Sequence, residues 1–113
     1  MEFIDLKAQF YKIEDKITNS INKVLHHGKY IMGPEIKQLE NQLSNYVESK
    51  YCISCSSGTD ALLMALLAIE VKPGDAIITT PFTFVATAEV ICLLGATPVF
   101  VDINPNTFNI DVQ

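Results

Sequence analysis

Apolar residues in the first part of the chain recur in steps of three and four, which is the spacing of one face of an α-helix. They are Leu6, Phe10, Ile13, Ile17, Ile21 and Val24. This pattern predicts a helix that ends near Gly28, because glycine commonly stands just beyond a helix C-terminus.

A second helix is predicted after the loop HHGKYIMGPE. The triplet Gly33-Pro34-Glu35 indicates its start, since proline suits the first helical position and a carboxylate there interacts favourably with the helix dipole. Its apolar face consists of Ile36, Leu39, Leu43 and Tyr46. Residues 1–50 are therefore expected to form an N-terminal helical segment.

From residue 51 onward, short apolar runs alternate with longer ones, which is typical of βαβ units with parallel strands and right-handed crossovers. The predicted strands are YCISC, AIITT and PVFVDI, at residues 51–55, 76–80 and 98–103. The helices between them are predicted at residues 58–69 and 81–94, and Gly95 ends the second. The predicted fold class is α/β, with two leading helices followed by βαβαβ.

Three parallel strands are few for such a sheet, because both of its faces and both of its edges need cover. The sequence stops shortly after a turn, NPN, that follows the third predicted strand. We therefore expect residues 51–113 to be the start of a larger α/β domain.

The composition is that of a globular domain, and it argues against one class of partner. Of the 113 residues, 49% are hydrophobic and 19% are charged, so the chain can form a core. The net charge is -5 and all eight basic residues are lysines, which argues against nucleic-acid binding. Without arginine, the chain also lacks the best bidentate clamp for phosphate. Backbone amides and hydroxyls would have to hold such a ligand.

The apolar runs predict a cytoplasmic protein with no membrane association. The stretch MEFIDLKAQF has early acidic residues and no long apolar core, unlike a secretory signal. The longest apolar run, ALLMALLAI, has nine residues, too few to cross a bilayer.

The cysteines and histidines do not indicate a metal or redox site. Three cysteines do not suggest a secreted disulfide scaffold. Cys52 and Cys55 fall on a predicted strand, where residues three apart point to opposite faces. His26 and His27 are interpreted as solvated residues at a helix C-terminus.

The stretch SSGTDA, residues 56–61, is the strongest candidate for a binding site. It joins a predicted strand to the N-terminus of an apolar helix, where free N–H groups and the helix dipole favour an anion. Gly58 allows close approach of the backbone, and Ser56, Ser57 and Thr59 offer hydroxyls. Asp60 opposes this reading unless its carboxylate turns aside. An ordinary capped helix is the alternative interpretation.

Two aromatic residues, Phe82 and Phe84, follow the second predicted strand. Both can be core residues, or one of them can stack on the flat ring of a ligand. Their spacing does not decide between these roles.

Several stretches, taken in order, resemble a known family. They are FIDLKAQF, GKYIMGPEI, SSGTDALLMAL, KPGDAIITTPFTFVATAEVI and GATPVFVDINPNTFNID, which cover nearly the whole chain. The chain resembles the N-terminal part of the DegT/DnrJ/EryC1/StrS aminotransferases, fold-type I enzymes that use pyridoxal 5'-phosphate (PLP). Many of these transfer an amino group from glutamate to a nucleotide-linked keto sugar, and they work as homodimers.

The resemblance implies roles for individual residues. Gly58, Thr59 and the backbone of Asp60 match the positions that hold the PLP phosphate, and Phe84 matches the residue that stacks on the PLP ring. The loop GKYIMG matches a segment near the sugar-nucleotide site. The resemblance therefore implies that the substrate-binding residues include Tyr30, Met32 and Gly33.

Two elements of the family are missing from this sequence. They are the K-N-L-G stretch with the Schiff-base lysine, and the aspartate that pairs with the pyridine nitrogen. No catalytic residue is therefore assigned, and the chain alone is expected to be inactive. It is interpreted as a truncated copy, one piece of a split protein or a non-functional gene remnant. A small phosphate-binding α/β module is the alternative.

Overall fold

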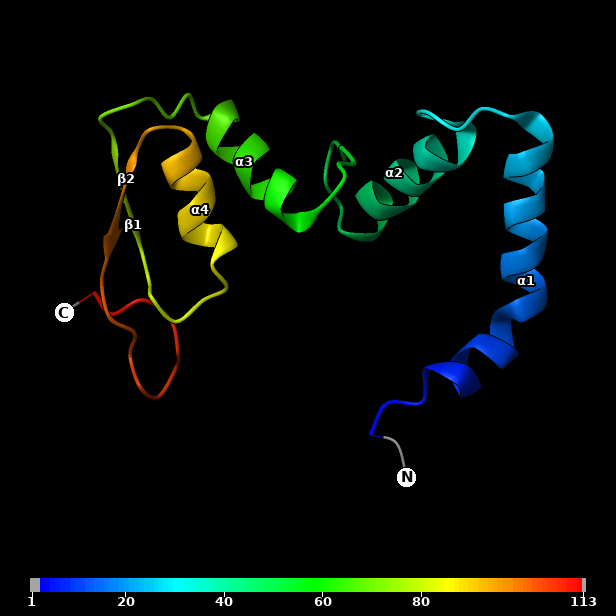
Figure 1. Cartoon of the computed structure of the whole chain (residues 1–113), viewed down its shortest axis with the longest axis horizontal. Helices are drawn as coiled ribbons and strands as arrows, with labels where there is room; N and C mark the ends of the chain where they lie inside the picture. Colours follow the sequence, from blue (N-terminus) through cyan, green and yellow to red (C-terminus); the bar gives the residue numbers. More distant parts are fainter. Residues whose placement is uncertain (1–2, 113) are drawn as a thin grey trace. The chain divides into compact units, whose positions relative to one another are not determined.

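The computed structural model describes residues 3–112 and divides into two compact units, Met1–Ser54 and Cys55–Gln113. Each unit has its own local architecture (Figure 1). The first contains the helices α1 and α2, and the second contains α3, β1, α4 and β2.

Helix α1, Leu6–His27, has a defined cap at each end. The Asp5 carboxylate accepts a hydrogen bond from the Ala8 N–H at 2.9 Å, which satisfies one of the free amides of the first turn. Gly28 adopts the left-handed conformation, φ +67°, and its N–H donates to the Val24 carbonyl at 3.0 Å. The predicted helix and its end at Gly28 are confirmed.

Helix α2, Pro34–Tyr46, begins where the sequence indicates. Gly33 caps it in an extended conformation without a side-chain bond, and Pro34 occupies the first turn. The Glu40 carboxylate accepts hydrogen bonds from the Ser54 N–H at 2.9 Å and the Ser54 hydroxyl at 2.6 Å. These two bonds lower the pKa of Glu40 and hold the end of the first unit against α2.

The second unit is built on a parallel βαβ crossover. The strands β1, Ala76–Thr79, and β2, Thr97–Phe100, pair in parallel from Ala76↔Thr97 to Thr79↔Phe100. Helix α4, Ala86–Leu93, connects them and packs against both, as Figure 1 shows. Helix α3, Gly58–Ala68, packs on α4. The α/β class and the parallel pairing are confirmed.

The prediction of a strand at residues 51–55 is wrong for this chain. Among the described residues the sheet has only β1 and β2, and residues 51–55 pair with neither. A strand exists only through a neighbour that accepts its ladder of hydrogen bonds. Here the N–H of Ser54 is instead taken by the Glu40 side chain.

The predicted helix at residues 81–94 begins five residues later than expected, at Ala86. Its first bonds run between residues three apart, from the Thr87 N–H to the Phe84 carbonyl and from the Ala88 N–H to the Val85 carbonyl. Residues 81–85 therefore form a loop that carries both candidate aromatics.

The last predicted strand is also shorter than expected. Strand β2 ends at Phe100. The chain then turns at residues 105–107 and returns to form an isolated antiparallel bridge, Ile103↔Ile110.

Few side chains of the described residues are fully buried. The buried hydrophobic residues are Ala86, Val90, Ile91 and Ala96. An apolar hollow of about 220 Å³ lies between α3, β1 and α4, and Leu62, Leu66 and Ile77 are among its lining residues. The apolar faces that define the helices in the sequence thus remain largely uncovered within residues 3–112.

A type II turn leads into β1, and Pro73 and Gly74 are residue types that suit its two central positions. The Asp75 N–H donates to the Lys72 carbonyl at 3.1 Å, and Gly74 has φ +95°, the value that this turn requires of its third residue. The Gly74 N–H donates to the carbonyl of Gly95 at 3.2 Å. Gly95 itself is left-handed, φ +73°, and a Cβ there would lie 3.1 Å from the Pro73 ring.

Gly95→Ala should destabilise the second unit. The left-handed backbone disfavours a side chain by about 1–2 kcal/mol, and the contact with Pro73 adds to this. Gly74→Ala is the matched control, since its φ is also positive but nothing lies within 4 Å of the added Cβ. Urea unfolding followed by circular dichroism should show the larger loss for Gly95→Ala. A smaller loss than in the control would contradict the role of the Pro73 contact.

Candidate functional site

The N-terminus of α3 presents free backbone amides. Ser57, in extended conformation, is the N-cap, and its hydroxyl oxygen accepts from the Asp60 N–H at 3.1 Å. The first intrahelical bond runs from the Ala61 N–H to the Ser57 carbonyl at 3.0 Å. The N–H groups of Gly58 and Thr59 precede that bond, so the helix leaves both of them available.

The Asp60 carboxylate turns back toward the residues that precede the helix. Its Oδ2 accepts from the hydroxyls of Ser56 and Ser57, the latter at 3.0 Å. These two hydrogen bonds lower the pKa of Asp60, and the bond from Ser56 has the larger effect. Both serine hydroxyl hydrogens are therefore engaged with Asp60 inside the chain.

The remaining donors are arranged to suit a phosphate. Two amides, those of Gly58 and Thr59, stand at the positive end of α3, and the Thr59 hydroxyl has no partner among the described residues. A Cβ built on Gly58 would meet nothing within 4 Å, so the approach to the amides is open. This set of neutral donors fits an anion without help from a basic side chain.

The aromatic residues of the loop before α4 differ in their surroundings. The ring of Phe82 stacks on Phe108, with centroids 5.7 Å apart and an interplanar angle of 27°. Phe84 is 76% exposed and has no ring partner among the described residues. Among the described residues, no hydrogen bond or ring contact joins Phe84 to the start of α3. Gly58, Thr59 and Asp60 lie together because they are consecutive residues of α3.

The three residues predicted near a substrate lie in the loop between α1 and α2. The Tyr30 hydroxyl donates to the Leu25 carbonyl at 3.4 Å, and most of the Tyr30 ring is exposed. Met32 is exposed and has a positive φ of 49°. Gly33 is buried at the start of α2. These residues belong to the first unit, and α3 and Phe84 belong to the second.

The interpretation of both histidines as solvated was only half right. His26 makes a 2.7 Å contact from Nδ1 to the Asn22 carbonyl of its own helix. His27 Nε2 instead lies 3.0 Å from Glu35 Oε1 of α2. The sequence gives one weak signal for this pair: each stands beside one end of the same short loop.

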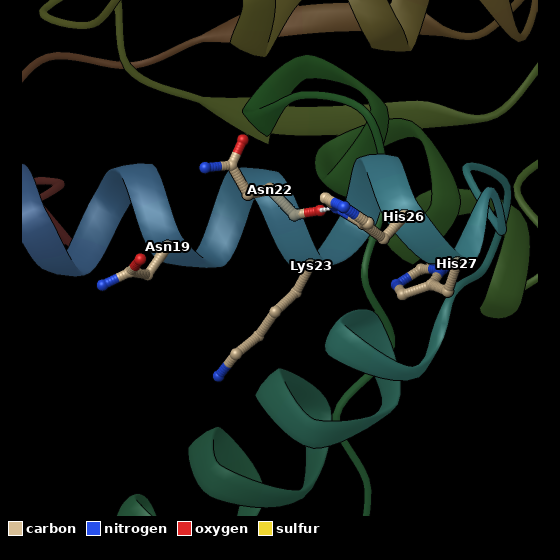
Figure 2. A pocket seen from close by; sticks show the side chains of 5 residues that line it. All are labelled: Asn19, Asn22, Lys23, His26 and His27. Atoms are coloured by element: carbon tan, nitrogen blue, oxygen red, sulfur yellow. Dashed lines mark hydrogen bonds between the residues drawn. The ribbon is translucent and has the colours of Figure 1, made fainter.

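A groove of about 750 Å³ runs along the surface of α1 (Figure 2). It is lined by Asn19, Asn22, Lys23, His26 and His27. All five residues come from one helix, so the groove is a feature of that helix surface and not an enclosed cavity.

Within residues 3–112, no group of three or more His, Cys, Asp or Glu side chains is placed to hold a metal ion. The three cysteines are unpaired, and the Cys55 thiol donates to the Ser57 carbonyl at 3.2 Å. No helix of the same residues has both the length and the apolar character needed to cross a membrane.

Comparison with known proteins identifies the family. Residues 11–113 match the DegT/DnrJ/EryC1/StrS aminotransferase family. The chain belongs to this family. It is 57% identical over 113 residues to the UDP-2-acetamido-2-deoxy-3-oxo-D-glucuronate aminotransferase of Pseudomonas aeruginosa, covering 100% of this chain and 32% of that protein. This DegT-family chain thus spans about one third of the length of that curated relative.

Solved structures of the DegT family share the fold. A family aminotransferase from Brucella abortus superimposes with a TM-score of 0.93 at 46% identity, over 99% of this chain and 30% of its own. NtdA from Bacillus subtilis, solved with bound cofactor PMP, gives a TM-score of 0.85 at 42% identity. That match covers 88% of this chain and 23% of NtdA.

The serine bonds should be visible in the titration of Asp60. Its carboxyl should titrate below its ordinary value of 3.8, and Ser56→Ala should move the pKa back toward that value. Because the folded-state pKa is lowered, these bonds stabilise the fold above pH 3.8, and their contribution is lost as the pH falls through the lower pKa. Carboxyl NMR shifts measure the titration, and Ser20→Ala in α1 is the control. An unchanged pKa in Ser56→Ala would show that the serine does not set it.

Proposed function

We propose that this chain is the N-terminal part of a PLP-dependent aminotransferase that acts on a nucleotide-linked keto sugar, with glutamate as the amino donor. The observation that carries the proposal is the 57% identity, over the whole chain, to a UDP-linked keto-sugar aminotransferase. The PMP-bound structure of NtdA, 42% identical, supports the choice of cofactor.

In this proposal, the start of α3 anchors the PLP phosphate. The amides of Gly58 and Thr59 and the Thr59 hydroxyl donate to it, and the dipole of the 11-residue helix favours its charge. Asp60 is proposed to border the phosphate with its backbone in the first turn of α3, where its N–H donates to the Ser57 hydroxyl at 3.1 Å. Its carboxylate is held by Ser56 and Ser57, which keeps it engaged with other donors.

Phe84 is proposed to cover the PLP ring. Its exposed side chain has no aromatic partner of its own among residues 3–112, whereas Phe82 is occupied by Phe108. Offset stacking on a flat ring suits an aromatic in this position. When bound, PLP supplies the electron sink for amino-group transfer, and these residues fix its position.

The loop that carries Tyr30, Met32 and Gly33 is proposed to contact the sugar nucleotide. Tyr30 and Met32 offer an exposed aromatic ring and an exposed thioether side chain. The backbone around them is tightly folded, since a Cβ on Gly33 would lie 2.5 Å from the Lys29 carbonyl oxygen.

The reactive lysine and the aspartate for the pyridine nitrogen are assigned to the part of the family's length that this chain does not span. We further propose that residues 51–113 are the start of the PLP-binding domain and that residues 1–50 precede it as a helical segment. The complete enzyme is proposed to be a cytoplasmic homodimer. The uncovered apolar faces of α1 support an assembly, because such faces are normally buried.

A chimaera tests this function. The chain is joined to the remainder of the Pseudomonas aeruginosa relative and incubated with PLP, glutamate and UDP-2-acetamido-2-deoxy-3-oxo-D-glucuronate. We expect 2-oxoglutarate and an amino sugar from the chimaera, and no turnover above a PLP-only control from the 113-residue chain alone. A folded chimaera that binds PLP but does not transaminate would contradict the proposed reaction.

Thr59→Ala should weaken PLP binding by the chimaera. One hydrogen bond to a charged group contributes about 1.5–3 kcal/mol, which corresponds to a roughly 10- to 150-fold rise in Kd. Thr59→Ser keeps the hydroxyl and should bind nearly as the parent does. Thr18→Ala, an exposed change on α1, is the control. Equilibrium titration of PLP followed by absorbance measures Kd, and equal values for Thr59→Ala and the parent would remove Thr59 from the site.

A further inference from the structure

The loop between α1 and α2 is closed tightly by backbone constraints at both ends. At its start, left-handed Gly28 donates its N–H to Val24 at 3.0 Å. At its end, Gly33 lies so close to the Lys29 carbonyl that an added Cβ would clash at 2.5 Å. The path of the backbone from residue 28 to residue 33 is thus narrowly defined.

His27 connects the two ends of this loop through both ring nitrogens. Its Nδ1 accepts a hydrogen bond from the Lys29 N–H at 3.0 Å. A backbone N–H can only donate, so Nδ1 carries no hydrogen and the ring hydrogen of the neutral form is on Nε2. Nε2 therefore donates to Glu35 Oε1, also at 3.0 Å. One side chain of α1 thus holds the first residues of the loop and the first turn of α2.

The surroundings of Glu35 favour the charged acceptor that this bridge needs. The carboxylate accepts from its own backbone N–H and from the His27 ring, and these two bonds, with the nearby charge of Lys23, lower the pKa of Glu35. A hydrogen bond to an ionised carboxylate is stronger than a neutral one. His26, in contrast, makes its hydrogen bond to the Asn22 carbonyl and turns toward its own helix in Figure 2.

We propose that the His27–Glu35 bridge positions the loop 28–33 for binding of the nucleotide-linked sugar, with His27 and Glu35 as positioning residues. The proposal rests on the proposed function for its substrate. The bridge fixes the backbone while leaving the side chains of Tyr30 and Met32 exposed, 64% and 69% respectively. A loop ordered before the ligand arrives loses less conformational entropy on binding, which strengthens affinity without adding a contact.

Trypsin cleavage after Lys29 tests the bridge in the 113-residue chain, because Lys29 lies within the loop. His27→Asn keeps an acceptor for the Lys29 N–H but is too short to reach Glu35, and His27→Ala removes both bonds. Both variants should be cut after Lys29 about three- to tenfold faster than the parent, as expected when one ordered segment is released. His26→Ala is the matched control and should not change the rate.

Cleavage after Lys16, in the middle of α1, requires that helix to open and therefore reports on unfolding beyond the loop in the same digests. A faster cut after Lys29 alone supports the bridge, and rates in His27→Asn equal to the parent overturn it. If His27→Ala also accelerates cleavage after Lys16, that variant has lost the structure of α1, and His27→Asn decides. Mass spectrometry of the fragments assigns each cut.

The chimaera tests the link to substrate. His27→Asn should raise KM for the sugar nucleotide about three- to tenfold, in line with the added ordering of one loop on binding, and leave kcat and PLP affinity unchanged. His26→Ala should change none of them. An unchanged KM in an active His27→Asn enzyme overturns the positioning role, whereas an inactive parent chimaera contradicts the proposed function and with it the substrate half of this proposal. In either case, the trypsin cleavage rates still test whether the His27–Glu35 bridge orders the loop.

Discussion

The packing of α4 across the β1–β2 pair is the contact on which the second unit depends. The buried hydrophobic residues of the described chain, Ala86, Val90, Ile91 and Ala96, all lie in α4 or in the turn that follows it. Burial of a large aliphatic side chain contributes about 1.5–3 kcal/mol. Val90 and Ile91 therefore offset only a small part of the conformational entropy that an ordered unit loses. Left-handed Gly95 turns the chain from the end of α4 into β2, and the parallel register places β2 beside β1. Both features are therefore needed for α4 to pack on the strand pair.

The first unit is organised by polar contacts at the ends of its helices. Asp5 caps α1, His27 joins it to Glu35, and Glu40 holds Ser54. The apolar face of α1 contributes little by itself, since Ile13 and Ile17 remain 38% and 37% exposed. Local hydrogen bonds define where these helices begin and end. Burial of their apolar faces would stabilise them further, but these faces remain largely exposed within residues 3–112.

Features determined by local interactions were predicted from the sequence, and features that need a distant partner were not. The helix boundaries at Gly28 and Pro34 and the turn at Gly74 follow from the conformations that these residues favour. The strand expected at residues 51–55 did not form, because a strand requires a second segment and the Ser54 amide is taken by Glu40. The same distinction holds at the candidate site. Gly58, Thr59 and Asp60 are adjacent in sequence, so their placement at the start of α3 was predictable, but no spacing rule showed that Asp60 would occupy both serine hydroxyls.

The candidate phosphate anchor and the candidate substrate loop depend on different interactions. The anchor uses neutral amides, a hydroxyl and a helix dipole, in a chain that has no arginine and a net charge of -5. Its affinity must therefore come from short hydrogen bonds, because the chain as a whole repels an anion at long range. The candidate substrate loop is held by a bond between a histidine and an ionised carboxylate with Lys23 nearby, and this bond depends on charge. Salt and acid weaken a partly exposed charged contact of this kind. At the anchor, salt instead screens the long-range repulsion of the anion and does not remove the amide donors. In the proposed complete enzyme, cofactor retention and substrate affinity should therefore respond differently to ionic strength, although both candidate sites are built from the same 113 residues.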